Sequence, residues 1–179
     1  MSTDYRFCPQ CATPLGWVEA MEDGGPTLRL RCGACNFTHW NNPTPVLAAV
    51  VQCADRDGQL LLARNAAWSG KMYALITGFM EAGESPEAGI AREVLEETNL
   101  VAERVELIGV WDFQRMNQVI IAYHVVARGE IRLSPELVDY RLFAPGEVMC
   151  WPSGTGHALA EWLRRQGVEP RYFEWPAKP

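Results

Sequence analysis

The most informative part of this sequence is the stretch 78–100, which reads GFMEAGESPEAGIAREVLEETNL. Its middle begins like a helix, because Ser85 is a favoured N-cap residue and Pro86 suits the first helical position. Glu87 adds a negative charge to the first turn, where it interacts favourably with the helix dipole. These signals predict a helix that runs to about Thr98 and follows a glycine-containing acidic loop.

Three carboxylates share one face of this predicted helix. Glu96 and Glu97 follow Glu93 by three and four positions, so the three side chains project from the same side. Each exposed like-charged pair costs about 0.2–0.5 kcal/mol, a penalty that a hard cation such as Mg²⁺ or Mn²⁺ would remove. A solvated acidic face is the other interpretation, but the glycine loop, the helix start and Arg92 accompany the glutamates. The remaining face carries apolar residues that would pack on a sheet, namely Ile90, Ala91, Val94 and Leu95.

Strand patterns surround this helix. Val46–Ala54 is a nearly uninterrupted apolar run, which predicts a strand buried on both faces. Asp55–Gly58 is a turn signal, after which Gln59–Arg64 returns as a second strand. The other expected elements are strands at Tyr73–Thr77, Val105–Phe113, Val119–Arg128 and Tyr140–Phe143, and a helix at Gly156–Arg165. This mixture predicts an α/β fold with a mixed sheet.

Residues 1–43 differ from the rest of the chain by two CxxC pairs, whose cysteines are Cys8, Cys11, Cys32 and Cys35. Twenty residues separate the pairs, which is the usual spacing of a four-thiolate zinc site. Four thiolates complete the zinc tetrahedron, so such a site is structural; redox thiols or two disulfides are the alternatives. The prolines of Asn41–Pro45 predict a linker. We therefore expect a zinc ribbon over 1–43 and a second domain over 44–179.

Composition narrows the class of protein. Hydrophobic residues make up 48% of the 179 residues and charged residues 21%, which is typical of a globular protein with a sizeable core. The net charge of −6 argues against binding nucleic acid or anionic lipid through bulk electrostatic attraction. The first residues are polar, and no apolar run approaches the roughly eighteen residues of a membrane span. We expect a cytoplasmic protein.

The stretch 78–100 resembles the Nudix box, G-x5-E-x7-R-E-U-x-E-E-x-G-U, at every defined position but one. Asn99 replaces a glycine of the pattern, and asparagine is the next-best residue for a left-handed helix cap. The resemblance to the Nudix hydrolases covers about residues 44–165. With the ribbon in front, the chain is most similar to the zinc-ribbon group that includes the NADH pyrophosphatases. The resemblance implies a Nudix fold, a mixed β-sheet sandwiched between helices, with an N-terminal four-cysteine zinc ribbon.

The resemblance also implies a reaction. Nudix hydrolases cleave nucleoside diphosphates linked to another moiety, with water and Mg²⁺ or Mn²⁺. Carried over to this sequence, the catalytic metal ligands are Gly78, through its carbonyl, Glu93, Glu96 and Glu97, and Arg92 orients the glutamates through an ion pair with a residue such as Glu84. Glu136 is the candidate for a further metal ligand downstream, with a simple turn carboxylate as the alternative. Glu96 is the expected general base.

Substrate choice follows less directly from the resemblance. Trp40 and Phe79 would stack on the base of the substrate; otherwise each is a packing residue. The stretch Trp111–Gln118 stands where NADH pyrophosphatases carry a proline- and tryptophan-rich signature. NADH, ADP-ribose, FAD and other dinucleotides therefore all remain candidate substrates.

Two other functions compete with this one. The first is a non-catalytic nucleotide sensor on a Nudix scaffold, with the ribbon as its partner contact. The second is an enzyme that acts on nucleotide-capped RNA ends, against which the acidic balance of the chain counts. Between its cysteine pairs the ribbon carries three acidic and two basic side chains, Glu19, Glu22, Asp23, Arg29 and Arg31. A scaffold or homodimer contact is therefore favoured over a nucleic-acid reader.

Overall fold

A computed structural model describes residues 5–67, 70 and 72–173 of the chain. The Cα positions divide the chain into two compact units, Met1–Pro43 and Thr44–Pro179. Each unit is described by itself.

The first unit is a small antiparallel sheet. Strand β1, Leu15–Glu22, pairs along its whole length with β2, Gly25–Cys32, and the two-residue β3, Thr38–His39, joins the other side of β2. Within this unit, the sequence has a β-like pattern only at Thr27–Arg31, which lies in β2. Strand β1 escapes the pattern because most of its side chains are exposed, so it lacks a buried apolar alternation.

The second unit is built on a six-stranded mixed sheet with the order β7-β8-β4-β5-β9, to which β6 is added by pairing with β4. The pairing of β4 with β8 is parallel, and the other pairings in this sheet are antiparallel. The strands are β4 Thr44–Cys53, β5 Leu60–Asn65, β6 Ile76–Phe79, β7 Val101–Phe113, β8 Gln118–Arg128 and β9 Leu137–Phe143. Outside the sheet, β10 Met149–Cys150 pairs in parallel with β11 Arg171–Tyr172, and a 3₁₀ turn, η1 Gln114–Met116, joins β7 to β8.

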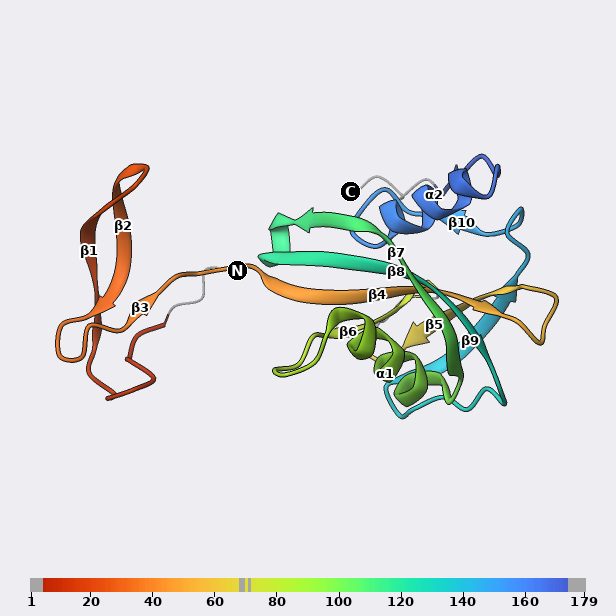
Figure 1. The fold of residues 1–179 in the computed structure, drawn as a ribbon, viewed down its shortest axis with the longest axis horizontal. Coiled ribbons are helices and arrows are strands. Elements are labelled where there is room, and N and C mark those ends of the chain that lie inside the picture. The colour runs from red at the N-terminus through yellow and green to blue at the C-terminus, as the bar shows by residue number, and fades with distance from the viewer. Residues whose placement is uncertain (1–4, 68–69, 71, 174–179) are drawn as a thin grey trace. The chain divides into compact units, whose positions relative to one another are not determined.

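Two helices cover opposite faces of this sheet, α1 Pro86–Thr98 and α2 Gly156–Arg165 (Figure 1). Strand β4 is buried on both faces, as its apolar run predicts: Leu47 and Val51 pack in the core beneath α1, whereas Val50 packs in the core beneath α2. Burying a side chain of this size contributes about 1.5–3 kcal/mol, so β4 anchors both helices. The expectation of a mixed sheet between helices is confirmed.

Several element boundaries differ from the sequence expectation. Strand β4 begins at Thr44, so the end of the expected linker Asn41–Pro45 belongs to a strand. Pro45 is tolerated as the second residue of β4, close to the strand start, where proline is commonly found. Strand β7 begins at Val101, four residues before the expected start, because its first residues are too polar to show a buried alternation.

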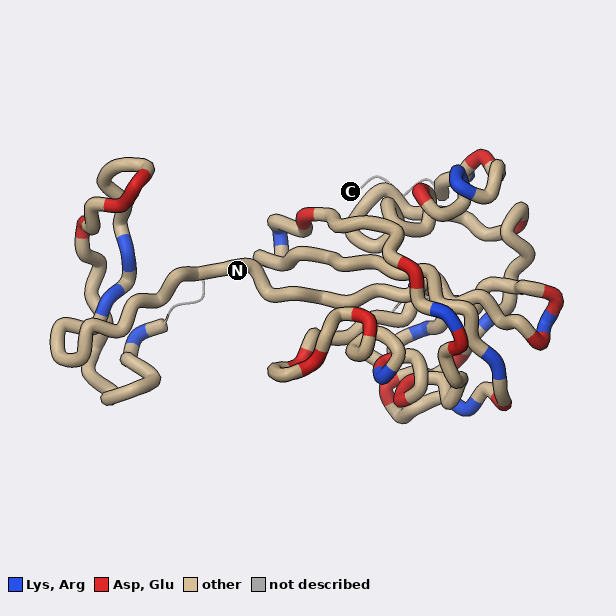
Figure 2. The backbone as a smooth tube through the Cα atoms, viewed as in Figure 1, with Lys and Arg blue, Asp and Glu red and all other residues tan. Residues whose placement is uncertain are grey.

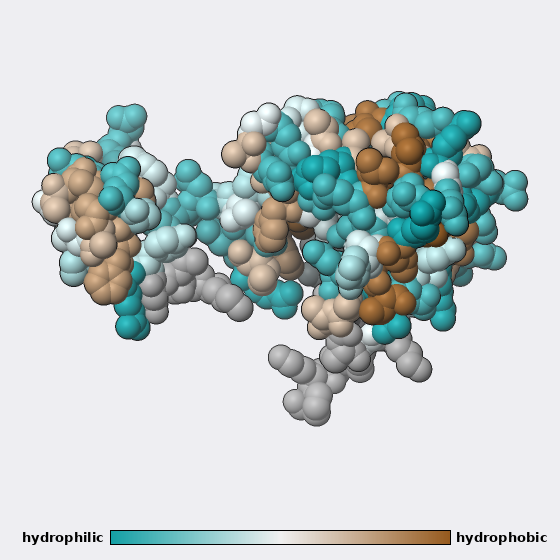
Figure 3. Space-filling model, turned by 90° about the horizontal axis from the view of Figure 1, so that it is seen from below, coloured by the Kyte–Doolittle hydropathy of each residue, from teal (hydrophilic) through white to brown (hydrophobic). Residues whose placement is uncertain are grey.

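The last described residues of the chain pack on the core of the second unit. Phe173 joins the core beneath α2 and stacks on Trp151, with 6.4 Å between the ring centroids. Residues 174–179 lie outside the described residues. On the face shown in Figure 3, apolar patches lie among hydrophilic side chains. No helix in the described part of the chain is long and apolar enough to cross a membrane.

Candidate metal and nucleotide site

Helix α1 is fixed at both ends by the residues expected to cap it. The Ser85 hydroxyl oxygen accepts a hydrogen bond from the Ala88 N–H at 3.2 Å. At the other end Asn99 is left-handed, with φ of 62°, and its N–H donates to the Leu95 carbonyl. The Asn99 side chain also donates to the Glu130 carbonyl at 2.8 Å. Asparagine therefore provides the cap that glycine provides in the family pattern.

Gly78 lies directly against the first glutamate of α1. A Cβ atom at Gly78 would lie 1.9 Å from Cδ of Glu93 and 2.0 Å from its Oε1. Any side chain at this position of β6 would therefore displace the Glu93 carboxylate. Gly89 permits a second close approach, since a Cβ there would lie 2.5 Å from Oε1 of Glu84 and 2.6 Å from a methyl group of Leu47. The two glycines bring β6, α1 and the preceding loop into one compact site.

Arg92 connects the acidic residues of this site. Its Nε and Nη2 donate to the two carboxylate oxygens of Glu84 at 3.1 and 2.9 Å, and Nη1 donates to Glu93 at 2.9 Å and to Glu96 at 3.0 Å. Nη2 also donates to the Phe79 carbonyl at 3.3 Å. The paired hydrogen bonds from Arg92, together with one from the Glu81 backbone, hold the pKa of Glu84 below its usual value. The guanidinium fork thus fixes three carboxylates at once.

Four carboxylates of the site repel one another, those of Glu93, Glu96, Glu97 and Glu136. Glu97 is only 8% exposed, and its burial, followed by the charges of Glu93, Glu136 and Glu96, raises its pKa to about 7. Burial also raises the pKa of Glu93, partly offset by Arg92. Figure 2 shows the acidic positions along α1 and the loop that precedes it. This part of the surface is therefore suited to a cation.

Glu136 belongs to the segment that leads into β9. The Ser134 N–H donates to the Glu97 carbonyl at 3.0 Å, which ties this segment to the end of α1, and the Glu136 carbonyl accepts a hydrogen bond from Ala66. The side chain of Glu136 is exposed, yet its charge acts on both Glu93 and Glu97. Among the described residues, however, only the four cysteines place three or more potential ligand atoms within 4.8 Å of one another. The glutamates thus share one region without converging on one point.

The four cysteines of the first unit do converge. The Cys8 and Cys35 sulfurs are 3.5 Å apart, those of Cys11 and Cys32 3.5 Å, and those of Cys11 and Cys35 3.6 Å. Sulfurs in a zinc tetrahedron with bonds of about 2.3 Å are separated by roughly 3.8 Å, whereas a disulfide bond is about 2.05 Å long. All four thiols are free. The cluster has the dimensions of a four-thiolate zinc site, and no disulfide joins these cysteines in the structure.

The backbone takes the same conformation around the two CxxC pairs. The Ala12 N–H donates to the Cys8 carbonyl at 2.9 Å, and the Asn36 N–H donates to the Cys32 carbonyl at 3.1 Å. Ala12 and Asn36 both take a left-handed conformation, with φ of 59° and 61°. The chain therefore presents each pair of thiols in the same kind of turn, which explains how two distant segments supply matching halves of one tetrahedron.

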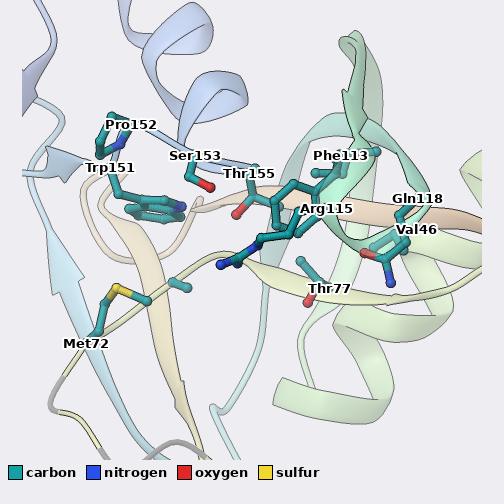
Figure 4. Close-up of a pocket in the computed structure, with 13 residues that line it drawn as sticks. Val46, Met72, Thr77, Phe113, Arg115, Gln118, Trp151, Pro152, Ser153 and Thr155 are labelled. Atoms are coloured by element: carbon teal, nitrogen blue, oxygen red, sulfur yellow. The ribbon is translucent and has the colours of Figure 1, made fainter. Parts of the chain in front are cut away.

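A pocket of about 560 Å³ opens in the second unit, on the face of the sheet that α2 covers. It is lined by parts of β4, β6, β8, the end of β7 with η1, and the turn before α2 (Figure 4). Its lining residues are Val46, Met72, Ala74, Thr77, Phe113, Arg115, Gln118, Ile120, Trp151, Pro152, Ser153, Gly154 and Thr155. Aromatic rings together with hydroxyl groups and one guanidinium group suit a ligand with a ring and polar substituents.

The pocket and the acidic site meet at β6. Thr77 lines the pocket, whereas Gly78, the next residue, faces Glu93. Phe79 follows Thr77 on the pocket face and pairs across the sheet with Val46, and its ring is 59% exposed. A molecule that extends past Phe79 would therefore reach both sites.

The two residues expected to stack on the substrate base belong to different units. Trp40 belongs to the first unit, where it is 56% exposed and lies beneath the Arg29 guanidinium at 5.3 Å, whereas Phe79 belongs to the second. Sequence reasoning missed the pocket residues Phe113, Arg115 and Trp151. The sequence does contain a signal for them. The stretch Trp111–Gln118 departs from the signature of the NADH pyrophosphatases, and three of its residues line the pocket.

Comparisons with known proteins agree on a family. A family model described as NUDIX domain matches residues 43–166. The NAD-capped RNA hydrolase NudC of Mycobacterium bovis (strain BCG / Pasteur 1173P2) is 32% identical over 152 residues, which cover 82% of this chain and 42% of that protein. NudC of Vibrio cholerae is 31% identical over 123 residues, 69% of this chain and 42% of that protein. The chain thus spans less than half the length of these curated relatives.

Solved structures show the same fold. A NUDIX hydrolase from Nitrosomonas europaea superimposes with a TM-score of 0.75 and 25% identity, covering 94% of this chain and 96% of that one. The NUDIX domain of Shewanella oneidensis NrtR, solved with ADP ribose, has a TM-score of 0.54 and 17% identity, covering 70% and 88%. The second likeness is one of fold alone.

Proposed function

Since this chain belongs to the NUDIX domain family, we propose that it is a Mg²⁺- or Mn²⁺-dependent pyrophosphohydrolase that cleaves nucleoside diphosphates linked to another moiety. One observation carries the proposal more than any other: Arg92 holds Glu84, Glu93 and Glu96 in place while Glu93 rests against Gly78. A sensor that only binds a nucleotide has no need for this complete acidic set. The arrangement therefore favours the enzyme over a non-catalytic scaffold.

The residues of the acidic site fit a hard divalent cation. Their donors are carboxylate oxygens, which suit such a cation. Burial, followed by repulsion from the neighbouring carboxylates, raises the pKa of Glu97, and a bound cation would relieve that repulsion. We assign the ligand roles to Glu93, Glu96, Glu97 and Glu136, with the Gly78 carbonyl as a further oxygen. When bound, the cation neutralises charge on the diphosphate and lowers the pKa of water.

The protein contributes orientation and proton transfer. Arg92 is a positioning residue, since it fixes the carboxylates and does not itself need to touch the substrate. We assign the general base to Glu96, which is exposed on α1 and therefore accessible to the attacking water. Its hydrogen bond to Arg92 sets the direction of the carboxylate. The attack would break one P–O bond of the diphosphate bridge and leave two monophosphates.

We propose a separate, structural zinc ion in the first unit, held by Cys8, Cys11, Cys32 and Cys35. Four thiolates leave zinc no open position for catalysis. The described core of this unit is small, with Leu30 buried beside Cys8 and Cys32, so the metal would supply much of its stability. The domain assignment follows: a zinc ribbon over 1–43 and a Nudix hydrolase domain over 44–179. We retain a homodimer contact as a proposed second role of the ribbon.

The proposed substrates are two-headed dinucleotides such as NADH, ADP-ribose or FAD. The pocket lining suits one ring and its polar substituents. Phe79 is two residues from Thr77, which lines that pocket, and its carbonyl accepts a hydrogen bond from Arg92 of the acidic site. The curated relatives are named NAD-capped RNA hydrolases. The NAD cap of such an RNA contains a dinucleotide diphosphate, which is the part that this pocket would bind. In the ribbon, Glu22 neutralises Arg29 through two hydrogen bonds at 2.7 and 2.6 Å. The free dinucleotide is therefore favoured over RNA.

A substrate panel tests this function. NADH, ADP-ribose, FAD, NAD-capped RNA and nucleoside triphosphates would be incubated with the protein and Mg²⁺ or Mn²⁺, and the products separated by chromatography. We expect two monophosphates from at least one dinucleotide, and slower turnover of triphosphates. Tight nucleotide binding without turnover on any compound would instead support the sensor, and a clear preference for capped RNA would support the RNA-processing enzyme.

A further inference from the structure

The pocket beside β6 has an unusual charge for this protein. Among the described residues that line it, Arg115 is the only ionised side chain and none is acidic, although the whole chain carries a net charge of −6. We infer that Arg115 makes the enzyme selective for substrates whose second moiety carries an anionic group in addition to the diphosphate that is cleaved. The inference rests on the proposed function and names the substrate class within it.

Arg115 is held at the pocket by its local structure. It lies in the middle of η1, the tight turn between β7 and β8, which ends at the left-handed Asn117. Its guanidinium carbon lies 5.4 Å from the centroid of the Phe113 ring, which also lines the pocket. Figure 4 shows the Arg115 side chain reaching across the pocket from Phe113 toward Trp151. Cation–π contact of this kind supports one face of the guanidinium, and the edge that carries the N–H donors remains available.

Those donors have no acidic partner in the described part of the chain, where no carboxylate forms an ion pair with Arg115. Arg92 and Arg29, by contrast, each donate two hydrogen bonds to one carboxylate, that of Glu84 and that of Glu22. A guanidinium group with its planar fork of donors matches the oxygens of a phosphate or carboxylate. An external anion would therefore satisfy the donors that the protein leaves unused.

Other polar groups of the pocket would complete the set around this anion. Ser153 and Thr155 lie in the turn before α2, on the side toward which Arg115 extends (Figure 4). Their hydroxyl groups are donors to anionic oxygens. Trp151 and Phe113 offer apolar ring surface beside them. The chemistry of the lining is thus that of a ring next to an anionic substituent, such as a phosphorylated nucleoside.

Matched substrate pairs test the inference, because they differ by one phosphate. NADPH and CoA would be compared with NADH and dephospho-CoA. For the wild-type protein we expect a higher kcat/KM for the phosphorylated member of at least one pair. Arg115→Gln should lower that preference, measured as the ratio of kcat/KM between the two members of the pair, by about tenfold to a hundredfold, the range of a lost hydrogen bond to a charged group. Arg115→Lys should restore part of the preference. Arg164→Gln is the matched control, since it removes an exposed charge from α2 outside the pocket.

Equilibrium binding separates this inference from the proposed function. Calorimetry without added Mg²⁺ or Mn²⁺ measures the same pairs without turnover, and we expect the same dependence on Arg115. Tighter binding of the phosphorylated member that depends on Arg115, without hydrolysis of any compound, would overturn the proposed function and leave the role of Arg115 standing. Hydrolysis with no preference in either pair, or with a preference that Arg115→Gln leaves unchanged, would overturn the role of Arg115.

Discussion

The carboxylate of Glu93 occupies the space in which a side chain of residue 78 would begin, with its Cδ 1.9 Å from the position of a Cβ on Gly78. Because the clash involves the end of a flexible side chain, Gly78→Ala can be accommodated by moving Glu93. We expect the variant to unfold at nearly the wild-type temperature but to lose about a hundredfold or more of its turnover, the scale seen when an electrostatic element of an active site is lost.

A double-mutant cycle checks the cause of that loss. In a Glu93→Gln background, Gly78→Ala should add little, because both changes disable the same carboxylate. Additive losses of turnover would mean that Gly78 acts independently of Glu93.

Phe79 should affect binding more than chemistry. Its exposed ring lies on the pocket face of β6, and stacking on a base contributes roughly 1–3 kcal/mol. Phe79→Ala should therefore raise KM about five- to a hundredfold on the best dinucleotide while kcat changes little. Trp40→Ala, measured in the same assay, tests whether the ribbon contributes a second aromatic ring that stacks on the base. An unchanged KM in both variants would contradict the stacking proposal.

The ribbon should contain one zinc ion for each chain, distinct from the exchangeable catalytic ion. Elemental analysis of protein purified without added metal measures it. Cys32→Ser removes one of four converging thiols, so we expect loss of zinc and of stability, with a much smaller effect on kcat for a dinucleotide. A zinc content near zero in the wild-type protein would contradict the assignment.

His124 should make the protein less stable at mildly acidic pH. The residue is 7% exposed, and its Nε2 lies 2.9 Å from Oε1 of Gln52. Burial, assisted by the charge of Arg104 and opposed by that of Glu106, lowers its pKa. As the pH falls below about 6.5, the unfolded chain takes up a proton that the folded His124 resists, so protons favour unfolding.

The contribution of His124 is isolated by comparing how the free energy of unfolding changes with pH in the wild type and in His124→Gln. Urea unfolding at pH 7.5 and 5.5 can be followed through tryptophan fluorescence, since Trp162 lies 5.2 Å from the His124 ring. On acidification the wild-type protein should lose more free energy of unfolding than the variant, by no more than about 1.4 kcal/mol per pH unit. Equal losses would show that His124 does not titrate in this range.

Much of this architecture could be predicted from local sequence. Short-range sequence signals account for three of its elements: the capped helix α1, the doubly buried strand β4 and the paired cysteine turns. The pocket could not be predicted in this way. Phe113, Trp151 and Thr77 come together only when β7, β6 and the turn before α2 are assembled around the sheet, and each looks like an ordinary packing residue in the sequence. The exposed strand β1 was missed because it lacks a buried alternation.

The proposed function requires the glutamates of α1 to support hydrolysis of a diphosphate. Its most direct test is the rate of cleavage of the best dinucleotide in Mg²⁺ or Mn²⁺, measured in parallel for wild type and Glu97→Gln. Glu97 is buried among the other carboxylates, and the glutamine has nearly the same shape, so the fold should persist. We predict metal-dependent release of two monophosphates by the wild type and a rate at least about a hundredfold lower for the variant. Equal rates for the two proteins, or cleavage that does not depend on the metal, would contradict the claim.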